Sequence, residues 1–404
     1  MTSQQPLFAR QPIYDVNLNV KGYELLFRPG DHEQEFDDDI ATSSVVLNAF
    51  SEVGLDKATE YSNAFINMPK SWLISPPPFK PKSIVIEILE TVDADSDVIS
   101  AVKRLKQQGY TIALDDFEYD ESKRELIELA DIIKVDVLAV QGEHLEQLVA
   151  ILKPYNKVLL AEKVEDYQVY EQCQSLGFTL FQGYFLCRPQ VFEGTVLPAN
   201  KLVLMRLLAD LQKPDVSIKD LKKSIVNDPT LSVKLLKIIN SAQYALHSKV
   251  DSVQQAITLL GLEKLKCWAS VIALSKLAEK PSELLSLTLT RAKMLEHLAN
   301  DTNARNPDMY FTIGLFSSVD AFFDQEKQSI LDTLPLEQEV CDALLSYSGP
   351  AGKLLQAAIN HEQGYWDKVD WPSLSHLNVN EEMLENAYTE GLRWAIGIMS
   401  SLLT

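Results

Sequence analysis

Acidic residues stand at the ends of several short apolar runs in the first half of the chain, where they could do chemistry together. Asp115 and Asp116 end "TIALDD", Glu87 ends "SIVIE", Glu162 ends "VLLAE", and Glu24 lies in "KGYELL". Carboxylates that converge on one place repel each other unless cations lie between them. These acids therefore favour a site for hard divalent cations.

Three further polar residues occupy corresponding places: Asn67 in "AFIN", Lys134 in "DIIK" and Gln182 in "TLFQ". Two Mg²⁺ or Mn²⁺ ions about 3.5–4 Å apart, sharing one aspartate, could activate a water and stabilise a leaving alkoxide in phosphodiester hydrolysis. Lys134 would orient that water or offset charge on the phosphate. For any single acid a solvated strand end or a salt bridge is the simpler interpretation, but independent acids need not gather at one end of several strands.

The elements that must position these residues follow a βα pattern. From residue 5 to about 190, short apolar runs alternate with amphipathic helical segments, as a parallel sheet requires. The candidate strands are "PLFARQPIYD", "VKGYELLFR", "NAFINM", "SIVIEIL", "TIALDDF", "DIIKVDVL", "KVLLAEKV" and "TLFQGYF". Their number predicts a closed barrel, in which an active site lies at the carboxyl ends of the strands.

The strand pattern stops after "LPAN" at residues 197–200, and helical periodicity continues to the end of the chain. We therefore expect two domains, an α/β barrel over residues 1–197 and an all-α domain over residues 198–404. The change in pattern places the boundary near 195–200.

Composition limits the class of protein. The 404 residues include 46% hydrophobic and 23% charged side chains, which is typical of a soluble globular protein, and the net charge is −20. So negative a chain is a poor match to a nucleic-acid polymer, although a small anionic ligand remains possible where metals supply positive charge. Neither a signal peptide nor a run of about 18 apolar residues is present, so we expect a cytoplasmic protein without a membrane span. The four cysteines show no CxxC spacing and are expected to be reduced thiols.

The first domain resembles the EAL family of cyclic di-GMP phosphodiesterases. The resemblance rests on motifs in a fixed order: "ARQPIYD", "YELLFR", "INMP", "IEILE", "LDDF", "IIKVD", "AEKVE" and "QGYFLCRP". It implies a TIM-like barrel that hydrolyses cyclic di-GMP to the linear dinucleotide pGpG.

The same resemblance implies a role for each matching residue. One metal would be held by Glu24, Asn67, Glu87 and Asp115, and a second by Asp115, Asp116 and Glu162. Lys134 would contact the catalytic water, and Gln182 would position water or a metal. Gln11 would lie beside a guanine, Arg28 would contact a ligand phosphate, and Glu90 would brace the loop after "DDF".

Leu25 replaces the alanine of the family's Glu-Ala-Leu signature, and three further positions depart from the family pattern. Glu118 and Lys163 stand where glycine is usual, and Leu89 stands where threonine is usual. In the family, the loop after "DDF" couples metal binding to dimerisation. Because Glu118 changes this loop, the formation of a homodimer stays an open question. Two outcomes remain open as well: the site hydrolyses cyclic di-GMP, or it binds the nucleotide without cleaving it.

The second domain resembles the HDOD family. "DPTL" at 228–231, "NSA" at 240–242 and "SVQQAITLLG" at 252–261 carry the resemblance, which extends to the whole EAL–HDOD arrangement. None of the six histidines is followed by Asp, so the His-Asp dyad of metal-dependent HD enzymes is absent. We expect this domain to regulate the barrel or to bind a protein partner.

Overall fold

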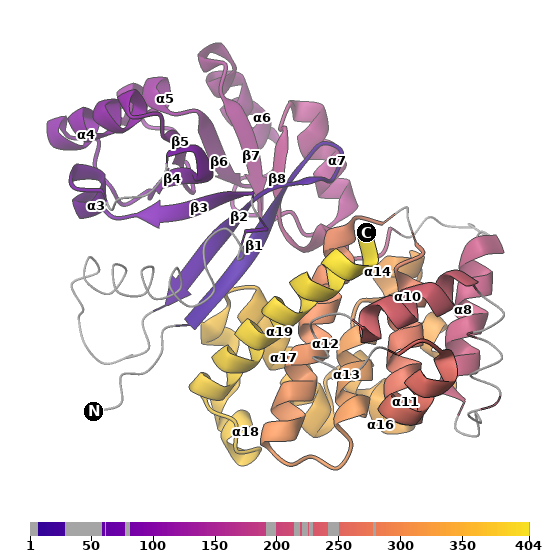
Figure 1. The fold of residues 1–404 in the computed structure, drawn as a ribbon. Coiled ribbons are helices and arrows are strands. Elements are labelled where there is room, and N and C mark those ends of the chain that lie inside the picture. Colours follow the sequence, from indigo (N-terminus) through magenta and orange to yellow (C-terminus); the bar gives the residue numbers. More distant parts are fainter. Residues whose placement is uncertain are drawn as a thin grey trace, which may run out of the picture. The chain divides into compact units, whose positions relative to one another are not determined.

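The computed structural model describes residues 7–28, 59–60, 62–76, 81–190, 199–213, 219, 225, 229–240, 250–277 and 280–403. The chain divides into two compact units. Unit 1 comprises Met1–Leu186 with Glu362–Gly364, and unit 2 comprises Cys187–His361 with Tyr365–Thr404. Figure 1 labels the elements of both.

Unit 1 is a closed barrel in which each strand pairs with its neighbours in sequence and β8 pairs with β1. The strands are β1 Leu7–Asp15, β2 Val20–Arg28, β3 Asn63–Met68, β4 Ile84–Ile88, β5 Thr111–Leu114, β6 Ile132–Asp136, β7 Val158–Glu162 and β8 Leu180–Gln182. From β2 to β8 the pairs are parallel, whereas β1 is antiparallel to both β2 and β8. The predicted TIM-like barrel is confirmed, with one reversed strand.

Helices connect the parallel strands of unit 1. They are α3 Lys70–Ile74, α4 Ser96–Gln107, α5 Arg124–Leu129, α6 Glu143–Leu152 and α7 Tyr167–Leu176. The carboxylates of Asp95 and Asp166 accept backbone N–H groups at the starts of α4 and α7. Gly177 ends α7 in a left-handed conformation, with φ 104°. These local signals fix where each helix turns back toward the next strand.

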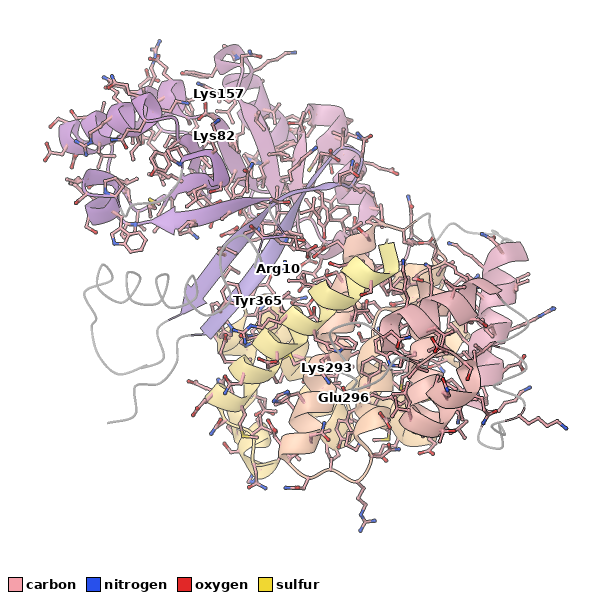
Figure 2. All side chains as sticks on the ribbon, in the orientation of Figure 1. Arg10, Lys82, Lys157, Lys293, Glu296 and Tyr365 are labelled. Carbon is pink, nitrogen blue, oxygen red and sulfur yellow. The ribbon has the colours of Figure 1, made fainter. Side chains whose placement is uncertain are left out.

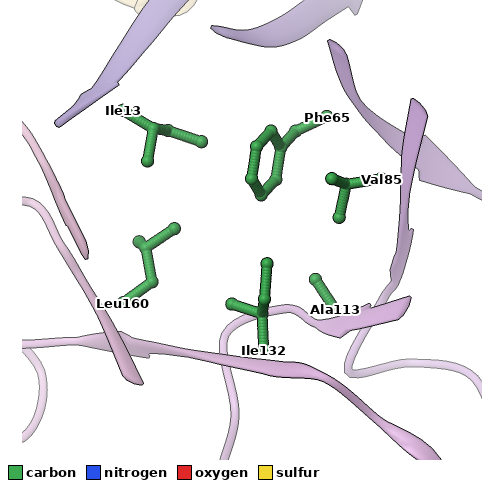
Figure 3. Packing of buried hydrophobic residues seen from close by; sticks show 6 residues of the cluster. All are labelled: Ile13, Phe65, Val85, Ala113, Ile132 and Leu160. Atoms are coloured by element: carbon green, nitrogen blue, oxygen red, sulfur yellow. The ribbon is translucent and has the colours of Figure 1, made fainter. Parts of the chain in front are cut away.

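The barrel interior contains a layer of apolar side chains from seven of the strands. Its buried members are Ile13, Phe65, Val85, Ala113, Ile132 and Leu160, and Leu180 packs against them. Figure 3 shows the six buried side chains pointing toward one another across the barrel. This layer closes the interior below the carboxyl ends of the parallel strands and gives the residues above it a rigid floor.

The described residues of unit 2 form helices joined by turns and loops and contain no strand, as predicted. Its helices are α8 Ala199–Gln212, α10 Pro229–Ile239, α11 Val253–Leu274, α12 Ser282–Asp301, α13 Pro307–Phe316, α14 Val319–Phe323, α15 Lys327–Leu331, α16 Gln338–Ser346, α17 Gly349–Glu362, α18 Trp371–His376 and α19 Glu381–Leu403. Gly261 interrupts α11 with φ 77°, where the "SVQQAITLLG" motif ends.

Helix α12 packs against both α13 and α19. Two glycines permit this packing: a Cβ on Gly314 would lie 2.4 Å from Ala292 Cα, and a Cβ on Gly391 would lie 2.7 Å from Thr290 O. The backbones therefore approach more closely than any side chain would allow. Among the described residues, no helix has both the length and the apolar character needed to cross a membrane.

Candidate active site

The period of two along each strand places the predicted site residues in one layer. Side chains at i and i+2 of a strand lie on the same face. Two residues beyond the apolar layer, the parallel strands present Asn67, Glu87, Asp115, Lys134, Glu162 and Gln182. Because the apolar layer faces the interior, the polar layer faces it too, one step nearer the mouth.

Strands β1 and β2 complete this ring. In the antiparallel β1 the direction is reversed, so Gln11 lies two residues before the core residue Ile13 and pairs with Glu24 of β2. Two residues before Glu24 is Gly22, where a Cβ would lie 2.7 Å from the Phe65 ring. A glycine at this position therefore makes room for the Phe65 ring.

Glu24 lies inside its strand, whereas Glu162 and Gln182 stand at the ends of theirs. Strand β2 continues to Arg28, because the antiparallel β1 pairs with it as far as Leu7↔Arg28. The parallel pairing of β2 with β3, however, ends at Glu24↔Phe65. Glu24 thus reaches the mouth of the barrel although its strand runs on.

Lys134 lies at the centre of the polar layer with its side chain fully buried. Its Nζ lies 2.5 Å from Asp115 Oδ1, 2.6 Å from Glu87 Oε1, 3.0 Å from Glu162 Oε1 and 3.1 Å from Glu24 Oε2. One ammonium group therefore faces four carboxylates. This arrangement leaves the centre of the site with an excess of negative charge.

Amide groups hold the Glu24 carboxylate from two sides. Asn67 Nδ2 donates to Glu24 Oε1 at 3.2 Å, and Gln182 Nε2 donates to Glu24 Oε2 at 2.8 Å. Gln182 Nε2 also donates to Gln11 Oε1 at 2.8 Å. These hydrogen bonds join β1, β2, β3 and β8 and fix the orientation of Glu24.

The pKa values reflect burial without enough counter-charge. Burial raises the pKa of Glu162 to about 8 and that of Glu87 well above its usual range, in spite of Lys134. Burial also raises the pKa of Asp115. For Glu24 the effect of burial is outweighed by Lys134 and by the amide hydrogen bonds, so its pKa is lowered. The pKa of Lys134 is raised well above normal, because the surrounding carboxylates outweigh the effect of its burial.

The oxygen atoms of this layer fit a divalent cation. Buried oxygens without a hydrogen-bond donor among the described residues are Asn67 Oδ1, Glu87 Oε2, Asp116 Oδ1, Glu162 Oε2 and Gln182 Oε1. Unsatisfied buried acceptors are costly, and Mg²⁺, Mn²⁺ and Ca²⁺ all bind to oxygen ligands of these types. No group of three acidic, His or Cys side chains in the described ranges is already arranged as a metal site. Four of the carboxylates instead face the ammonium of Lys134.

Asp116 lies at the rim rather than in the buried layer. It follows Asp115 beyond the end of β5, its side chain is 43% exposed, and its backbone is left-handed with φ 40°. Its Oδ1 lies 3.7 Å from Nζ of Lys163, which directly follows Glu162. Lys163 is also left-handed, with φ 57°, and forms an ion pair with Asp136.

Of the remaining positions that the sequence analysis singled out, Glu90 and Glu118 lie outside this network. Arg28 ends β2, but its side chain is outside the described residues. Glu90 is exposed, and its carbonyl accepts a hydrogen bond of 3.4 Å from Lys123 Nζ, so the link to the loop after Asp116 uses the main chain of Glu90. Glu118 is exposed and does not have a positive φ, so the left-handed residue in this loop is Asp116.

Sequence reasoning did not assign Asp136 or Lys163 to the site. Asp136 ends β6 two residues after Lys134, within the "IIKVD" motif, so its position at a strand end was a usable signal. Lys163 was visible only as a departure from the family pattern. The ion pair between them depends on the parallel register Asp136↔Glu162, which the sequence does not state.

Unit 2 contains polar clusters of a different kind. His361 is buried, with Nε2 3.3 Å from Glu385 Oε2. On α12, Lys293 Nζ lies 2.8 Å from Glu296 Oε2, and Figure 2 labels both side chains. Lys264 forms ion pairs with Glu296 and with Asp308. In the cluster on α12 the acids pair with nearby lysines, unlike the excess of carboxylates in the barrel.

The closed barrel and the ring of carboxylates, amides and one lysine at its mouth define unit 1 as a βα-barrel protein with an acidic, metal-type site. The model of the EAL domain family matches residues 49–189, and that of the HDOD domain family matches residues 197–325.

Two relatives match nearly the whole chain. The uncharacterized protein YuxH of Bacillus subtilis is 34% identical over 97% of this chain and 98% of its own length. The cyclic di-GMP phosphodiesterase CdgJ of Vibrio cholerae is 32% identical over 96% of this chain and 91% of its own length. The chain belongs to this family of two-domain proteins, in which an EAL domain precedes an HDOD domain.

Solved structures of EAL proteins are similar to the barrel at lower identity. One is Klebsiella pneumoniae BlrP1 in a complex with calcium and cyclic di-GMP, which is 22% identical, covers 46% of this chain and 56% of its own, and has a TM-score of 0.37.

Proposed function

We propose that this protein is a divalent-metal-dependent phosphodiesterase that hydrolyses cyclic di-GMP to linear pGpG. The observation that carries the proposal is the single polar layer at the barrel mouth, where buried carboxylate and amide oxygens lack hydrogen-bond donors among the described residues. The name of the relative CdgJ, a cyclic di-GMP phosphodiesterase, supports this substrate.

The residues that would hold divalent cations are Glu24, Asn67, Glu87, Asp115, Asp116 and Glu162. Bound Mg²⁺ or Mn²⁺ would supply Lewis acidity and a water of lowered pKa. Within the protein, Asn67 and Gln182 orient the Glu24 carboxylate through hydrogen bonds of 3.2 and 2.8 Å. Gln11 is tied to Gln182, so a ligand beside Gln11 would contact the same rigid network.

Hydrolysis adds one water across a phosphodiester bond. The water oxygen forms a bond to phosphorus, the bond from phosphorus to the ribose 3′ oxygen breaks, and that oxygen takes up a proton. Lys134 is the one buried cation among the described residues of the site, and in this reaction it would offset the charge that develops on the phosphate. Arg28, at the end of β2, would contact a ligand phosphate from outside the buried layer.

The test is hydrolysis of cyclic di-GMP by purified protein across a series of Mg²⁺ and Mn²⁺ concentrations. We expect pGpG to form and Glu24→Ala to abolish turnover, because Glu24 links the two amides to Lys134. The matched control is Glu143→Ala, which removes an exposed acid on α6 and should leave turnover unchanged. Full activity of Glu24→Ala would contradict the assignment.

One observation favours a second candidate function, a receptor that binds cyclic di-GMP without cleaving it. Asp116 pairs with Lys163, so its carboxylate is less available as the metal ligand that hydrolysis would require. Calorimetry that shows binding in the presence of metal, together with no product over hours, would select the receptor.

We also propose that residues 1–197 form the domain that acts on the nucleotide and that residues 198–404 form a regulatory domain that binds a protein partner. A homodimer and a cytoplasmic location stay predictions. Sedimentation velocity with and without Mn²⁺ would check the oligomeric state.

A further inference from the structure

Two left-handed residues face each other at the rim of the barrel. Lys163 has φ 57° and Asp116 has φ 40°, and both immediately follow a carboxylate of the polar layer. Residues other than glycine adopt this conformation reluctantly, and such strained residues cluster at functional sites. Here the two turns bring the ammonium of Lys163 to 3.7 Å from Asp116 Oδ1.

Lys163 has a second partner. Its ammonium also forms an ion pair with the carboxylate of Asp136, whose side chain is 17% exposed, compared with 43% for that of Asp116. Asp136 is in turn held by the backbone N–H groups of Leu138 and Ala139, at 2.8 and 3.0 Å. Asp136 therefore holds Lys163 in place next to Asp116.

Asp116 Oδ1 is buried and has no hydrogen-bond donor among the described residues. At 3.7 Å the Lys163 ammonium is too far away to form a good hydrogen bond with this oxygen, yet near enough to attract it electrostatically. Lys163 thus offsets the negative charge of this oxygen, but the oxygen still has a lone pair that accepts no hydrogen bond. A divalent cation that bound this lone pair would lie close to the ammonium and be repelled by it.

We propose that Lys163 is a tethered cation that competes with a divalent metal for Asp116 and so sets the metal concentration that the site requires. The proposal rests on the proposed function in taking Asp116 as a metal ligand. Lys163 is a positioning residue in this role, because it acts through Asp116 and touches no reacting atom.

The test measures Mn²⁺ binding to the chelator-treated full-length protein by calorimetry, without nucleotide. We expect Lys163→Asn to raise the affinity of the weaker Mn²⁺ site about tenfold, within the usual range for coupling between sites. Asn tolerates the left-handed backbone, so this variant removes the charge and keeps the turn. Lys163→Gly should act in the same direction.

Two controls separate charge from other effects. Lys163→Arg keeps the charge and should bind Mn²⁺ like the unmodified protein. Lys103→Asn removes an exposed lysine that pairs with Glu125 on the outer surface of the barrel and should also change nothing. In the Asp116→Asn background, Lys163→Asn should no longer increase Mn²⁺ affinity.

Unchanged or weaker Mn²⁺ binding by Lys163→Asn would overturn the proposal, as would an equal increase for Lys163→Arg. The outcome is independent of catalysis. If the protein forms no pGpG but Lys163→Asn binds Mn²⁺ more tightly, this inference holds and the proposed function is wrong. A protein that hydrolyses cyclic di-GMP while Lys163→Asn leaves Mn²⁺ binding unchanged shows the reverse.

Discussion

Lys134 offsets part of the negative charge at the barrel mouth. Its ammonium lies within 3.1 Å of an oxygen of each of four carboxylates, and its side chain is completely buried. Removing one partner from a buried ionic cluster leaves the others without compensation, which is more costly than replacing the whole cluster by apolar groups. Lys134 therefore has a structural role in addition to the catalytic one proposed for it.

Lys134→Met should destabilise the metal-free protein by about 3–5 kcal/mol, because four buried carboxylates then lack a cation. Urea unfolding in the presence of a chelator measures this loss. Added Mn²⁺ should restore part of the stability by supplying positive charge to the same oxygens. Lys103→Met, on the exposed surface, serves as the control and should change stability by less than about 0.5 kcal/mol. Equal stability of the two variants would contradict the central role of Lys134.

Two cysteines should be inert in the folded protein. Burial raises the pKa of Cys267 to about 12 and that of Cys173 to about 11. A thiol with so high a pKa contains almost no thiolate at pH 8, and the thiolate is the reactive form. Mass spectrometry after brief treatment with iodoacetamide at pH 8 should find both unmodified, and both should react after unfolding in guanidinium. Rapid labelling of either one in the native protein would contradict the described packing.

At the scale of elements, the site depends on how the loops after β7 and β8 pack together. Val164 N donates to Gln182 O at 3.0 Å, and Phe185 N donates to Val164 O at 3.1 Å. Gly183 lies between these bonds with φ 146°, and a Cβ there would lie 2.2 Å from Val164 O. The glycine allows a close backbone contact that holds Glu162 and Gln182 in the polar layer.

Gly183→Ala should therefore be more damaging than Gly177→Ala. Both glycines have positive φ, but nothing lies within 4 Å of a Cβ on Gly177. Both substitutions carry a backbone penalty, and Gly183→Ala adds the overlap with Val164, so we expect it to cost about 1–3 kcal/mol more. Urea unfolding of the two variants measures this difference. Gly183→Ala should also weaken Mn²⁺ binding, and equal effects of both substitutions on stability would argue against the close contact.

At the scale of the whole molecule, charge decides how an anionic nucleotide can bind. The chain has a net charge of −20, and the barrel mouth gathers four carboxylates around Lys134. Cyclic di-GMP carries two phosphodiester charges, so the protein repels its proposed ligand unless cations are bound. Divalent metal is therefore expected to be needed for binding, and not for hydrolysis alone.

Removal of divalent cations should weaken cyclic di-GMP binding on the order of a hundredfold, near the upper end of typical coupling between two sites. Calorimetry with Ca²⁺ and with a chelator measures this change. Mg²⁺ added back after the chelator should restore binding. Equally tight binding without metal would show that Arg or Lys side chains, such as that of Arg28, supply the positive charge instead.

Much of the fold follows from local sequence patterns. Each strand of the barrel was visible as a short apolar run, because strand formation depends on neighbouring side chains. The period of two then places Glu87, Asp115 and Glu162 on the inner face, two residues beyond Val85, Ala113 and Leu160. The EAL–HDOD order of the domains likewise follows from motifs that are contiguous in the chain.

Only the tertiary structure decided the features that depend on pairing between distant segments. The reversed direction of β1 keeps β2 paired past Glu24 as far as Arg28, and no local pattern states this reversal. Lys134 meets carboxylates from β2, β4, β5 and β7, and no local pattern states that four strands converge on one ammonium.

The ion pair between Asp116 and Lys163 shows the same difference between what the sequence states and what the tertiary structure decides. The sequence by itself determined that a lysine follows Glu162 and that Asp116 follows Asp115, since both facts are read from the chain. Their meeting at 3.7 Å required the closed barrel, the parallel register and two left-handed turns. Side-chain type is a local property, whereas the distance between two charges is set by the closure of the whole barrel.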